Sequence, residues 1–291
     1  MTTPRETFSA QRGAHTAAGR WRLPFSRQAW RGPAGNWLGA GAGSSLDFQD
    51  HRTYVPGDDP RHIHWQAFAR TGALTMKLYR AEVAPMVDIG VDVSASMELT
   101  PAKRARTDEL VAFCVECADR AGAPVRLHAA AGRTLRAVTP DEVRAGRWRE
   151  RLPVPAASEA SAPGPFPWRP GALKVLISDL LFPGDPAALL ASHASGAGVA
   201  LVLSPTLAEE AELPWRGNIE LTDCESGTVR TQRVDEGLAE RYAAAYARHF
   251  ALWREACRRR SVVFACVAAE GELVTALGGE AYAAGAVEAI T

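Results

Sequence analysis

Apolar side chains recur at every second position of residues 87–93, with aspartate and glycine between them. This period of two predicts a strand of a largely buried sheet. Three further runs, residues 173–177, 199–203 and 261–268, are almost continuously apolar, which is typical of strands covered on both faces. The chain is therefore predicted to contain a central sheet whose strands lie well apart in the sequence.

Helical patterns separate these strands. Residues 103–122 place apolar side chains on one face, and Gly122 is well placed just past the expected helix end. Residues 187–195 and 235–260 are predicted as two more helices, the second ending in arginines that the helix dipole favours. This alternation predicts a doubly wound α/β fold, in which helices cover both faces of a mainly parallel sheet.

Shorter elements complete the outline. Residues 73–82 alternate apolar and polar side chains and are predicted as a strand. Residues 218–234 are predicted as an inserted β-hairpin that turns at Glu225-Ser226-Gly227. The remaining predicted elements are two strands followed by two helices, at residues 124–130, 134–138, 141–152 and 279–290.

Three segments lack periodicity. Residues 1–20 are polar and rich in small residues, and they are predicted to form a disordered N-terminal tail. Residues 21–46 combine tryptophans with many glycines and are interpreted as a flexible loop, and residues 153–171 as a proline-rich connector. The expected organisation is the tail, a strand and loop extension over residues 21–84, and the α/β domain over residues 85–291.

The charge balance narrows the range of partners. The 33 basic and 33 acidic residues cancel, so nothing indicates nucleic acid or an anionic membrane surface. No apolar run approaches the length of about 18–20 residues that spans a bilayer, and the N-terminus lacks an apolar signal core. We therefore expect no membrane span and a cytoplasmic location. Five cysteines, an odd number, do not indicate a disulfide framework.

Candidate chemistry lies where two predicted strands end. Asp92, Ser94 and Ser96 follow the first strand at alternate positions, and Asp179 follows the strand of residues 173–177. Because ligands bind beyond the carboxyl ends of parallel strands, these oxygens are expected to converge. Carboxylate and hydroxyl oxygens suit a hard divalent cation such as Mg²⁺, whose incomplete shell leaves room for a partner's carboxylate. Turn and N-cap roles are the alternative interpretation of the same residues.

Several motifs in a fixed order resemble a bacterial family. A tyrosine is followed by a Pro-Gly-Asp-Asp turn, an Arg-x-Ile-x-Trp segment and an Ala-Arg pair, and then by a strand with Asp-x-Ser-x-Ser-Met. This order resembles the signature of the family called domain of unknown function 58. The matching residues are Tyr54, Pro56, Gly57, Asp58, Asp59, Arg61, Ile63, Trp65, Ala69, Arg70, Asp92, Ser94, Ser96 and Met97.

The resemblance has implications for the fold and the metal site. The family is similar to von Willebrand factor type A domains, doubly wound α/β domains that hold Mg²⁺ or Mn²⁺ at a metal-ion-dependent adhesion site (MIDAS). It implies that Asp92, Ser94 and Ser96 supply the first metal loop and Asp179 a later one. No Gly-Gly-Thr sequence is present for the middle loop, and Thr139 is the residue that would replace it.

The resemblance also implies a MoxR-type AAA+ ATPase as partner. The expected function is a non-enzymatic, metal-assisted interaction module that acts as an adaptor between such an ATPase and a protein client. Two alternatives stay open. One is a metal-dependent phosphoester hydrolase that uses Asp92, Asp179 and either His62 or His64, the latter standing where the family usually has aspartate. The other is a metal-free scaffold of the same fold.

Overall fold

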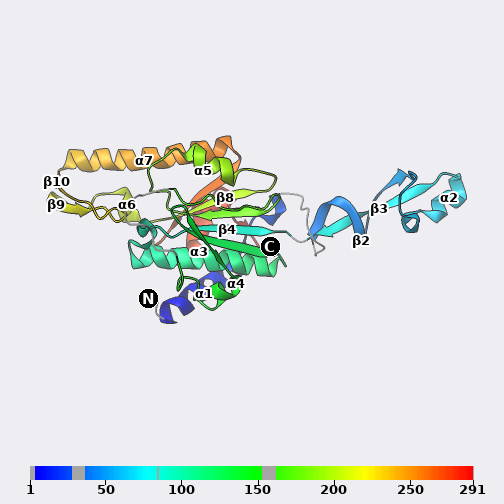
Figure 1. The fold of residues 1–291 in the computed structure, drawn as a ribbon, viewed down its shortest axis with the longest axis horizontal. Coiled ribbons are helices and arrows are strands. Elements are labelled where there is room, and N and C mark those ends of the chain that lie inside the picture. Colours follow the sequence, from blue (N-terminus) through cyan, green and yellow to red (C-terminus); the bar gives the residue numbers. More distant parts are fainter. Residues whose placement is uncertain (1–3, 28–36, 84, 153–161, 291) are drawn as a thin grey trace.

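The centre of the molecule is a six-stranded sheet in the order β11-β8-β7-β4-β5-β6 (Figure 1). The structure is a computed structural model that describes residues 4–27, 37–83, 85–152 and 162–290. The strands are β4 (Val87–Asp92), β5 (Val125–Ala131), β6 (Thr134–Val138), β7 (Leu173–Ile177), β8 (Ala200–Thr206) and β11 (Val262–Ala268). Only the β5–β6 pair of this sheet is antiparallel, so the prediction of a mainly parallel sheet is confirmed.

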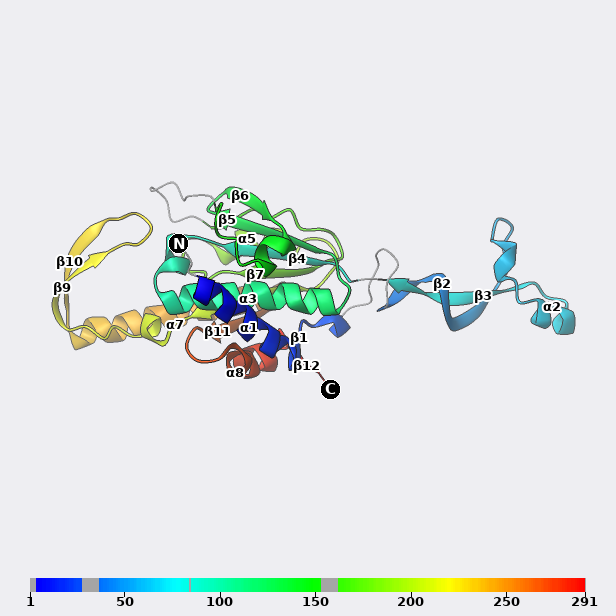
Figure 2. The ribbon, with the colours of Figure 1, turned by 90° about the horizontal axis from the view of Figure 1, so that it is seen from below.

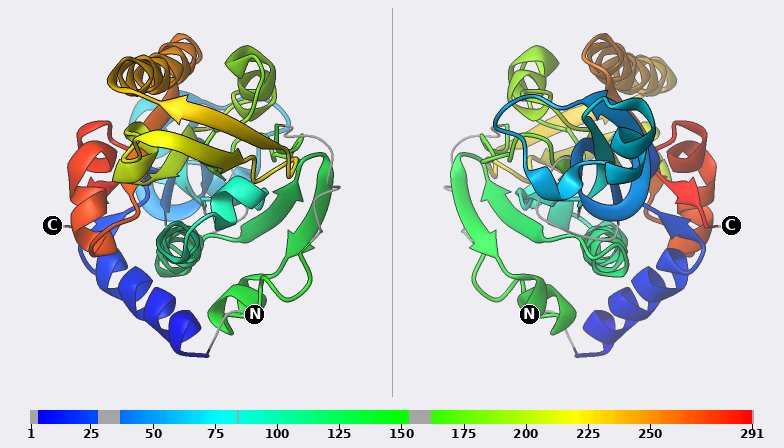
Figure 3. Two further views of the ribbon diagram at one scale, coloured as in Figure 1. Left: turned by 90° about the vertical axis from the view of Figure 1, so that its left-hand side faces the viewer. Right: turned by 90° about the vertical axis from the view of Figure 1, so that its right-hand side faces the viewer.

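Helices cover both faces of the sheet (Figures 1 and 3). The covering helices are α1 (Pro4–Ala18), α3 (Pro101–Arg120) and α4 (Pro140–Arg144) on one side, and α5 (Pro186–His193) and α7 (Glu236–Arg259) on the other. Consecutive side chains of β7 point to opposite faces. Val175 and Ile177 join the core beneath α3, whereas Leu176 joins the core with side chains of α5 and α7. The arrangement is that of a doubly wound α/β domain.

β4 is a central strand whose six residues are all buried. A Cβ atom added at Gly90 would lie 2.8 Å from Trp168 and 2.9 Å from Phe166. Glycine is therefore required for these aromatic side chains to pack on the strand. Arg169 fixes the same connector, because its Nε donates to Asp88 Oδ1 at 2.7 Å. Residues 153–161 of the predicted connector lie outside the described residues.

The N-terminal segment is helical, which corrects the prediction of a disordered tail for residues 4–18. The helix α1 contacts α3 and has a buried face of small side chains, with Ala14, Ala17 and Ala18 at most 2% exposed. Alanine is the best helix former but adds little to a hydrophobic pattern. The sequence pattern therefore did not reveal a helix that depends on tertiary packing.

The C-terminal segment corrects the prediction of a helix over residues 279–290. Its elements are α8 (Leu273–Ala276), η4 (Leu277–Ala281) and β12 (Glu288–Ala289). The strand that pairs with β12 is β1 (Trp21–Arg22). β12 and β1 pair antiparallel, and the Nε1 of Trp21 donates to the carbonyl oxygen of Val274 at 2.8 Å. This pairing joins the segment that follows α1 to the last described residues, and no local sequence pattern predicts such a long-range contact.

A two-stranded ribbon extends from the end of the molecule where β4 begins (Figures 1 and 2). Its elements are β2 (Trp37–Thr53), η2 (Pro60–His62), α2 (Trp65–Thr71) and β3 (Thr75–Val83). The short helix η1 (Phe25–Arg27) precedes the ribbon in the chain. β3 confirms the predicted strand at residues 73–82. β2 corrects the loop predicted over residues 21–46, of which residues 28–36 lie outside the described residues. The glycine-rich sequence has no period of two, and the β2–β3 pairing contains register shifts.

The predicted hairpin is confirmed. β9 (Gly217–Thr222) pairs antiparallel with β10 (Val229–Val234), and the hairpin lies at the end of the molecule opposite to the β2–β3 ribbon (Figure 1). The long helix α7 follows it directly. Within the described residues, no helix combines the length and the apolar character that crossing a bilayer requires.

The packing of α1 on α3 gives a testable prediction. Ala17→Asp places a carboxylate at a fully buried position, whereas the neighbouring Thr16→Asp changes an exposed one. We expect the first substitution to lower the free energy of unfolding by about 2–4 kcal/mol and the second by about 0.5 kcal/mol. Urea unfolding followed by circular dichroism measures both. Equal, small losses would contradict the docked position of α1.

Candidate metal centre

Two carboxylates meet at the carboxyl edge of the sheet, where β4 and β7 end. These strands are parallel neighbours, and Val91 is paired with Ile177 just before the two aspartates. The chain continues from β4 to β5 on one side and from β7 to β8 on the other, so the strand order switches direction between them. Doubly wound proteins open a ligand crevice at such a switch point. The structure therefore places Asp92 and Asp179 at the same edge, as the sequence predicts.

Asp92 is a buried and firmly held carboxylate, only 2% exposed. Its Oδ1 accepts a hydrogen bond from the backbone N–H of Ser94 at 3.0 Å, and its Oδ2 accepts one from Ser178 Oγ at 2.8 Å. Burial, followed by the negative charge of Asp179, raises the pKa of Asp92 to about 7. Because each carboxylate oxygen can accept more than one bond, both stay available to a further partner.

The serine hydroxyls lie together in the loop after Asp92. Ser94 Oγ and Ser96 Oγ are 3.2 Å apart. Ser96 and Met97 belong to the short helix η3 (Ala95–Glu98), and both are buried. The backbone N–H of Asp179 contacts Met97 Sδ at 3.2 Å, which ties the loop to the end of β7. Two hydroxyls and two carboxylates therefore share this edge.

A third carboxylate reaches the same loop from the β9–β10 hairpin. The backbone N–H of Ser96 donates to Glu225 Oε1 at 2.8 Å, across 129 residues of sequence. Figure 3 shows the hairpin lying across the carboxyl end of the sheet. Sequence reasoning found the turn but missed this role, since an acidic residue at a hairpin tip was the only signal.

An ammonium group is buried beside Asp179. Lys103 Nζ lies 2.6 Å from Asp179 Oδ2 and 2.5 Å from Glu210 Oε1, and the lysine is fully buried. Burial alone would lower the pKa of Lys103, but the attraction of the two carboxylates outweighs burial and the pKa is raised. Glu210 lies in α6 (Ala208–Ala211). Sequence reasoning missed this group because a lysine in the first turn of a predicted amphipathic helix is typical of a solvated position.

The donors at this edge fit a hard divalent cation. Asp92, Ser94, Ser96 and Asp179 offer carboxylate and hydroxyl oxygens, which Mg²⁺ and Mn²⁺ prefer. The raised pKa of Asp92 supports the fit, because a positive charge here would relieve the repulsion between the two carboxylates. Among the described residues, no three His, Cys, Asp or Glu side chains are grouped to hold a metal. A cation at this edge would therefore depend on the serine hydroxyls.

Thr139 does not belong to this group, which corrects the prediction that it would fill the middle metal loop. β6 runs antiparallel to β5, so the chain leaves β6 at the opposite edge of the sheet. There Thr139 caps α4: its Oγ1 accepts from the N–H of Glu142 at 3.2 Å, and Glu142 Oε2 accepts from the N–H of Thr139 at 2.8 Å. The predicted helix over residues 141–152 is also shorter, because α4 ends at Arg144.

The helix α2, whose N-cap is His64, lies at the far end of the β2–β3 ribbon (Figure 2), and His62 ends the short helix η2 just before it. His64 Nδ1 is 2.9 Å from His51 Nε2, and the two rings are stacked. The ribbon extends from the end of the sheet opposite to Asp92 and Asp179. The structure therefore brings neither histidine to the two carboxylates, where the hydrolase alternative would use one of them.

The turn residues of the family signature stabilise the same end of the ribbon. Asp58 pairs with Arg52 at 2.6 Å and also accepts from the N–H of Val55 at 2.9 Å. Asp59 caps η2 and pairs with Arg61 at 2.6 Å. In the described residues these side chains act on the local fold of the ribbon.

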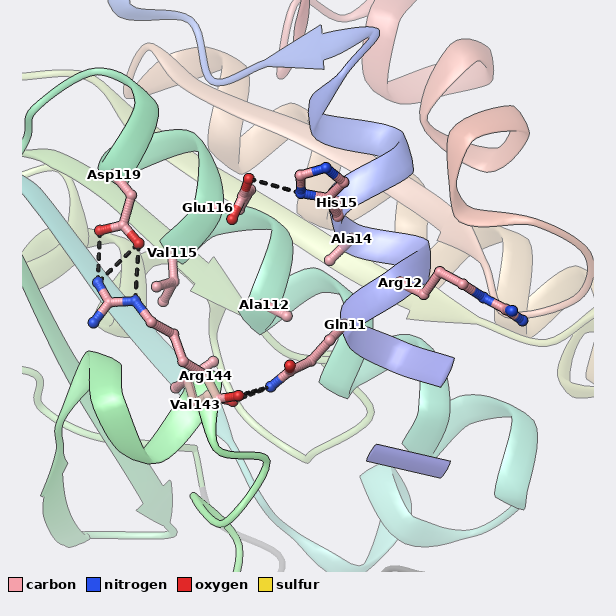
Figure 4. Close-up of a pocket in the computed structure, with 10 residues that line it drawn as sticks. All are labelled: Gln11, Arg12, Ala14, His15, Ala112, Val115, Glu116, Asp119, Val143 and Arg144. Atoms are coloured by element: carbon pink, nitrogen blue, oxygen red, sulfur yellow. Dashed lines mark hydrogen bonds and ion pairs between the residues drawn. The ribbon is translucent and has the colours of Figure 1, made fainter. Parts of the chain in front are cut away.

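A pocket of about 360 Å³ lies between α1, α3 and α4 (Figure 4). Two pairs of polar side chains lie at its rim: Arg144 lies 2.7 Å from Asp119, and His15 Nδ1 lies 3.1 Å from Glu116. The residues of its apolar floor are Ala14, Ala112, Val115 and Val143. These contacts hold the three helices together, and the pocket is separate from the edge that carries Asp92.

The fold and this edge define a doubly wound α/β domain with a carboxylate and hydroxyl site at its switch point. The sequence profile of the family described as "Protein of unknown function DUF58" matches residues 50–148. The matched region includes the Asp92 loop but not Asp179.

Two mycobacterial proteins are similar to this chain at 29% identity over 239 residues. They are "Uncharacterized protein Rv1480" of Mycobacterium tuberculosis (strain ATCC 25618 / H37Rv) and "Uncharacterized protein Mb1516" of Mycobacterium bovis (strain ATCC BAA-935 / AF2122/97). The similarity covers 74% of this chain and 72% of each relative.

Two solved structures are similar at 19% identity. The conserved hypothetical protein BatB from Bacteroides thetaiotaomicron has a TM-score of 0.39, over 69% of this chain and 98% of that one. An aerotolerance-related membrane protein from Bacteroides fragilis NCTC 9343 has a TM-score of 0.34, over 60% of this chain and 99% of that one. Both TM-scores are below 0.5, so neither likeness supports a conclusion about this chain.

The buried lysine gives a testable prediction. Lys103→Met leaves Asp179 and Glu210 without their shared cation, and we expect the free energy of unfolding to fall by about 3–5 kcal/mol. Lys174→Met is the matched control, since Lys174 is equally buried but donates to the carbonyl oxygen of Ser195. We expect the control to cost about 1 kcal/mol. Chemical denaturation measures both values, and equal costs would contradict the role assigned to Lys103.

Proposed function

We propose that this chain is a protein-interaction module of the domain of unknown function 58 family, with a von Willebrand factor type A-like domain that acts by binding. The observation that carries the proposal is the grouping of Asp92, Asp179 and the hydroxyls of Ser94 and Ser96 at the switch point of the sheet. A buried carboxylate with a raised pKa is costly to keep in the fold. Such a cost is typical of a functional site.

In this proposal Asp92, Ser94, Ser96 and Asp179 would hold Mg²⁺ or Mn²⁺. The bound cation would supply positive charge and coordination positions that a partner's carboxylate can complete. The N–H of Ser94 and the hydroxyl of Ser178 already fix the orientation of the Asp92 carboxylate. The site is therefore preorganised, and little side-chain freedom is lost when a ligand binds.

Binding is favoured over hydrolysis by the position of the histidines. A phosphoester hydrolase needs a metal-activated water and usually a base that takes its proton. The two histidines that the sequence offered for this role, His62 and His64, lie at the opposite end of the molecule. Neither histidine therefore supports the hydrolase alternative as the base that takes the proton.

As partners we propose a MoxR-type AAA+ ATPase and a protein client, as the family resemblance implies. The far end of the β2–β3 ribbon offers a second contact surface for such partners. Trp65 and Phe68 are both exposed there, and their rings meet edge to face at 6.2 Å. Aromatic side chains are enriched at protein interfaces, and exposed apolar patches often mark them.

A metal-free scaffold is the second candidate, and one observation favours it. Lys103 already places a positive charge 2.6 Å from Asp179. In this case the lysine replaces the cation, and Asp92 is held neutral by its raised pKa at pH values below about 7.

Titration of the purified chain with Mg²⁺ and Mn²⁺ by isothermal calorimetry distinguishes the two candidates. We expect saturable binding, weakened at least tenfold by Asp92→Asn. Asp141→Asn is the control, because that carboxylate is exposed and belongs to α4 at the opposite edge. Asp92→Asn also removes a buried charge, so we expect it to unfold at a higher temperature than the wild type in EDTA at pH 8. If folded wild-type protein binds neither ion, the proposal that this edge holds a divalent cation is refuted.

A further inference from the structure

The tip of the β9–β10 hairpin is hydrogen-bonded to the loop after Asp92 through an acidic side chain. Within residues 220–233, all of which the structure describes, every residue except Glu225 is exposed. Glu225 is half-buried because its Oε1 accepts from the N–H of Ser96 at 2.8 Å. The hairpin therefore places the carboxylate of Glu225 against the loop after Asp92 while the rest of its tip stays exposed to solvent.

The turn that carries Glu225 is itself well ordered. Asp223 Oδ1 accepts from the N–H groups of Glu225 and Ser226, at 2.8 and 3.0 Å. The carbonyl oxygen of Asp223 accepts from the N–H of Gly227, which has the positive φ of 69° that favours glycine. The acidic side chain is therefore held on a preformed turn, as an acidic loop of a binding partner would present it.

The place that Glu225 occupies belongs to the candidate metal loop. Ser96 supplies both the N–H that binds Glu225 and a hydroxyl that lies 3.2 Å from Ser94 Oγ. Partial burial raises the pKa of the neighbouring Cys224, and the negative charges of Glu225, Asp223 and Asp179 raise it further. The hairpin tip thus lies over the edge that carries both aspartates.

We propose that Glu225 is an internal ligand of the Asp92–Ser96 loop, and that its side chain occupies the place of a partner's acidic side chain. The external partner is then an Asp- or Glu-bearing turn that has to displace the hairpin tip. This inference rests on the proposed function, because a cation at the edge would attract the carboxylate of Glu225 towards those of Asp92 and Asp179. Without a cation, repulsion by Asp92 and Asp179 weakens the docking of Glu225.

The hairpin is suited to such an exchange. A two-stranded hairpin on its own is marginally stable, and β9 and β10 pair only with each other in the described sheets. Release of Glu225 breaks one hydrogen bond and leaves the six-stranded sheet and its two cores unchanged. The partner therefore competes with the hydrogen bond between Glu225 and the N–H of Ser96.

Two measurements on the full chain test this proposal, with Glu225→Ala compared with Glu220→Ala. Glu220 is an exposed residue of β9 in the same hairpin and serves as the matched control. Hydrogen exchange reports on the N–H of Ser96, which we expect to exchange at least tenfold faster in Glu225→Ala than in the wild type and the control. The second measurement is the affinity for the peptide acetyl-Asp-Ser-Glu-Ser-Gly-amide in Mg²⁺, with a peptide containing Gln in place of Glu as its control.

We expect Glu225→Ala to bind the Glu peptide at least tenfold more tightly than the wild type and Glu220→Ala do, and the Gln peptide to bind weakly to all three. Unchanged exchange at Ser96, or peptide binding to Glu225→Ala that is no tighter than to the wild type, would overturn the internal ligand. Repeating the binding in EDTA separates the two proposals. If Glu225→Ala still binds the peptide more tightly in EDTA, Glu225 is an internal ligand but no cation is needed. If Mg²⁺ binding is saturable but Glu225→Ala binds the peptide no more tightly, only the cation site is supported.

Discussion

The burial of two like charges at one edge of the sheet is the constraint on which this structure depends. Asp92 and Asp179 are both buried, and the charge of Asp179 helps to raise the pKa of Asp92. The fold lowers this cost with one ammonium group, Lys103, and with hydrogen bonds from Ser94 and Ser178. Burial of a charge that is only partly compensated is expensive in a protein interior. A divalent cation would compensate for it directly.

The parallel topology explains why so many groups meet at this edge. Strands of one direction end together, so the segments that follow β4, β7 and β8 all begin there. The segment after β4 contains Ser94 and Lys103, the segment after β7 contains Asp179, and the segment after β8 contains Glu210. The hairpin that adds Glu225 is inserted at the same end of the molecule, whereas the β2–β3 ribbon projects from the other (Figure 1). The fold therefore separates a charged edge from an exposed aromatic surface near Trp65.

The sequence predicts the sheet well because a period of two or an almost continuous apolar run marks four of its strands, β4, β7, β8 and β11. It does not predict α1, whose buried face is alanine, or β2, whose glycines carry no pattern. Asp92 and Asp179 are predictable as residues that follow strands. Thr139 is misplaced because hydrophobic patterning does not encode strand direction. Lys103 and Glu225 are missed because their partners lie 76 and 129 residues away.

A crystal of the protein grown with Mn²⁺ is the sharpest test of the proposal that the Asp92 edge binds a divalent cation. Anomalous diffraction identifies manganese without reference to the protein atoms. We expect one strong peak between the carboxylate of Asp92 and the hydroxyls of Ser94 and Ser96, and no such peak in crystals of Asp92→Asn. An ordered edge without a peak at saturating Mn²⁺, with Lys103 still paired to Asp179, would contradict the claim and leave a metal-free scaffold.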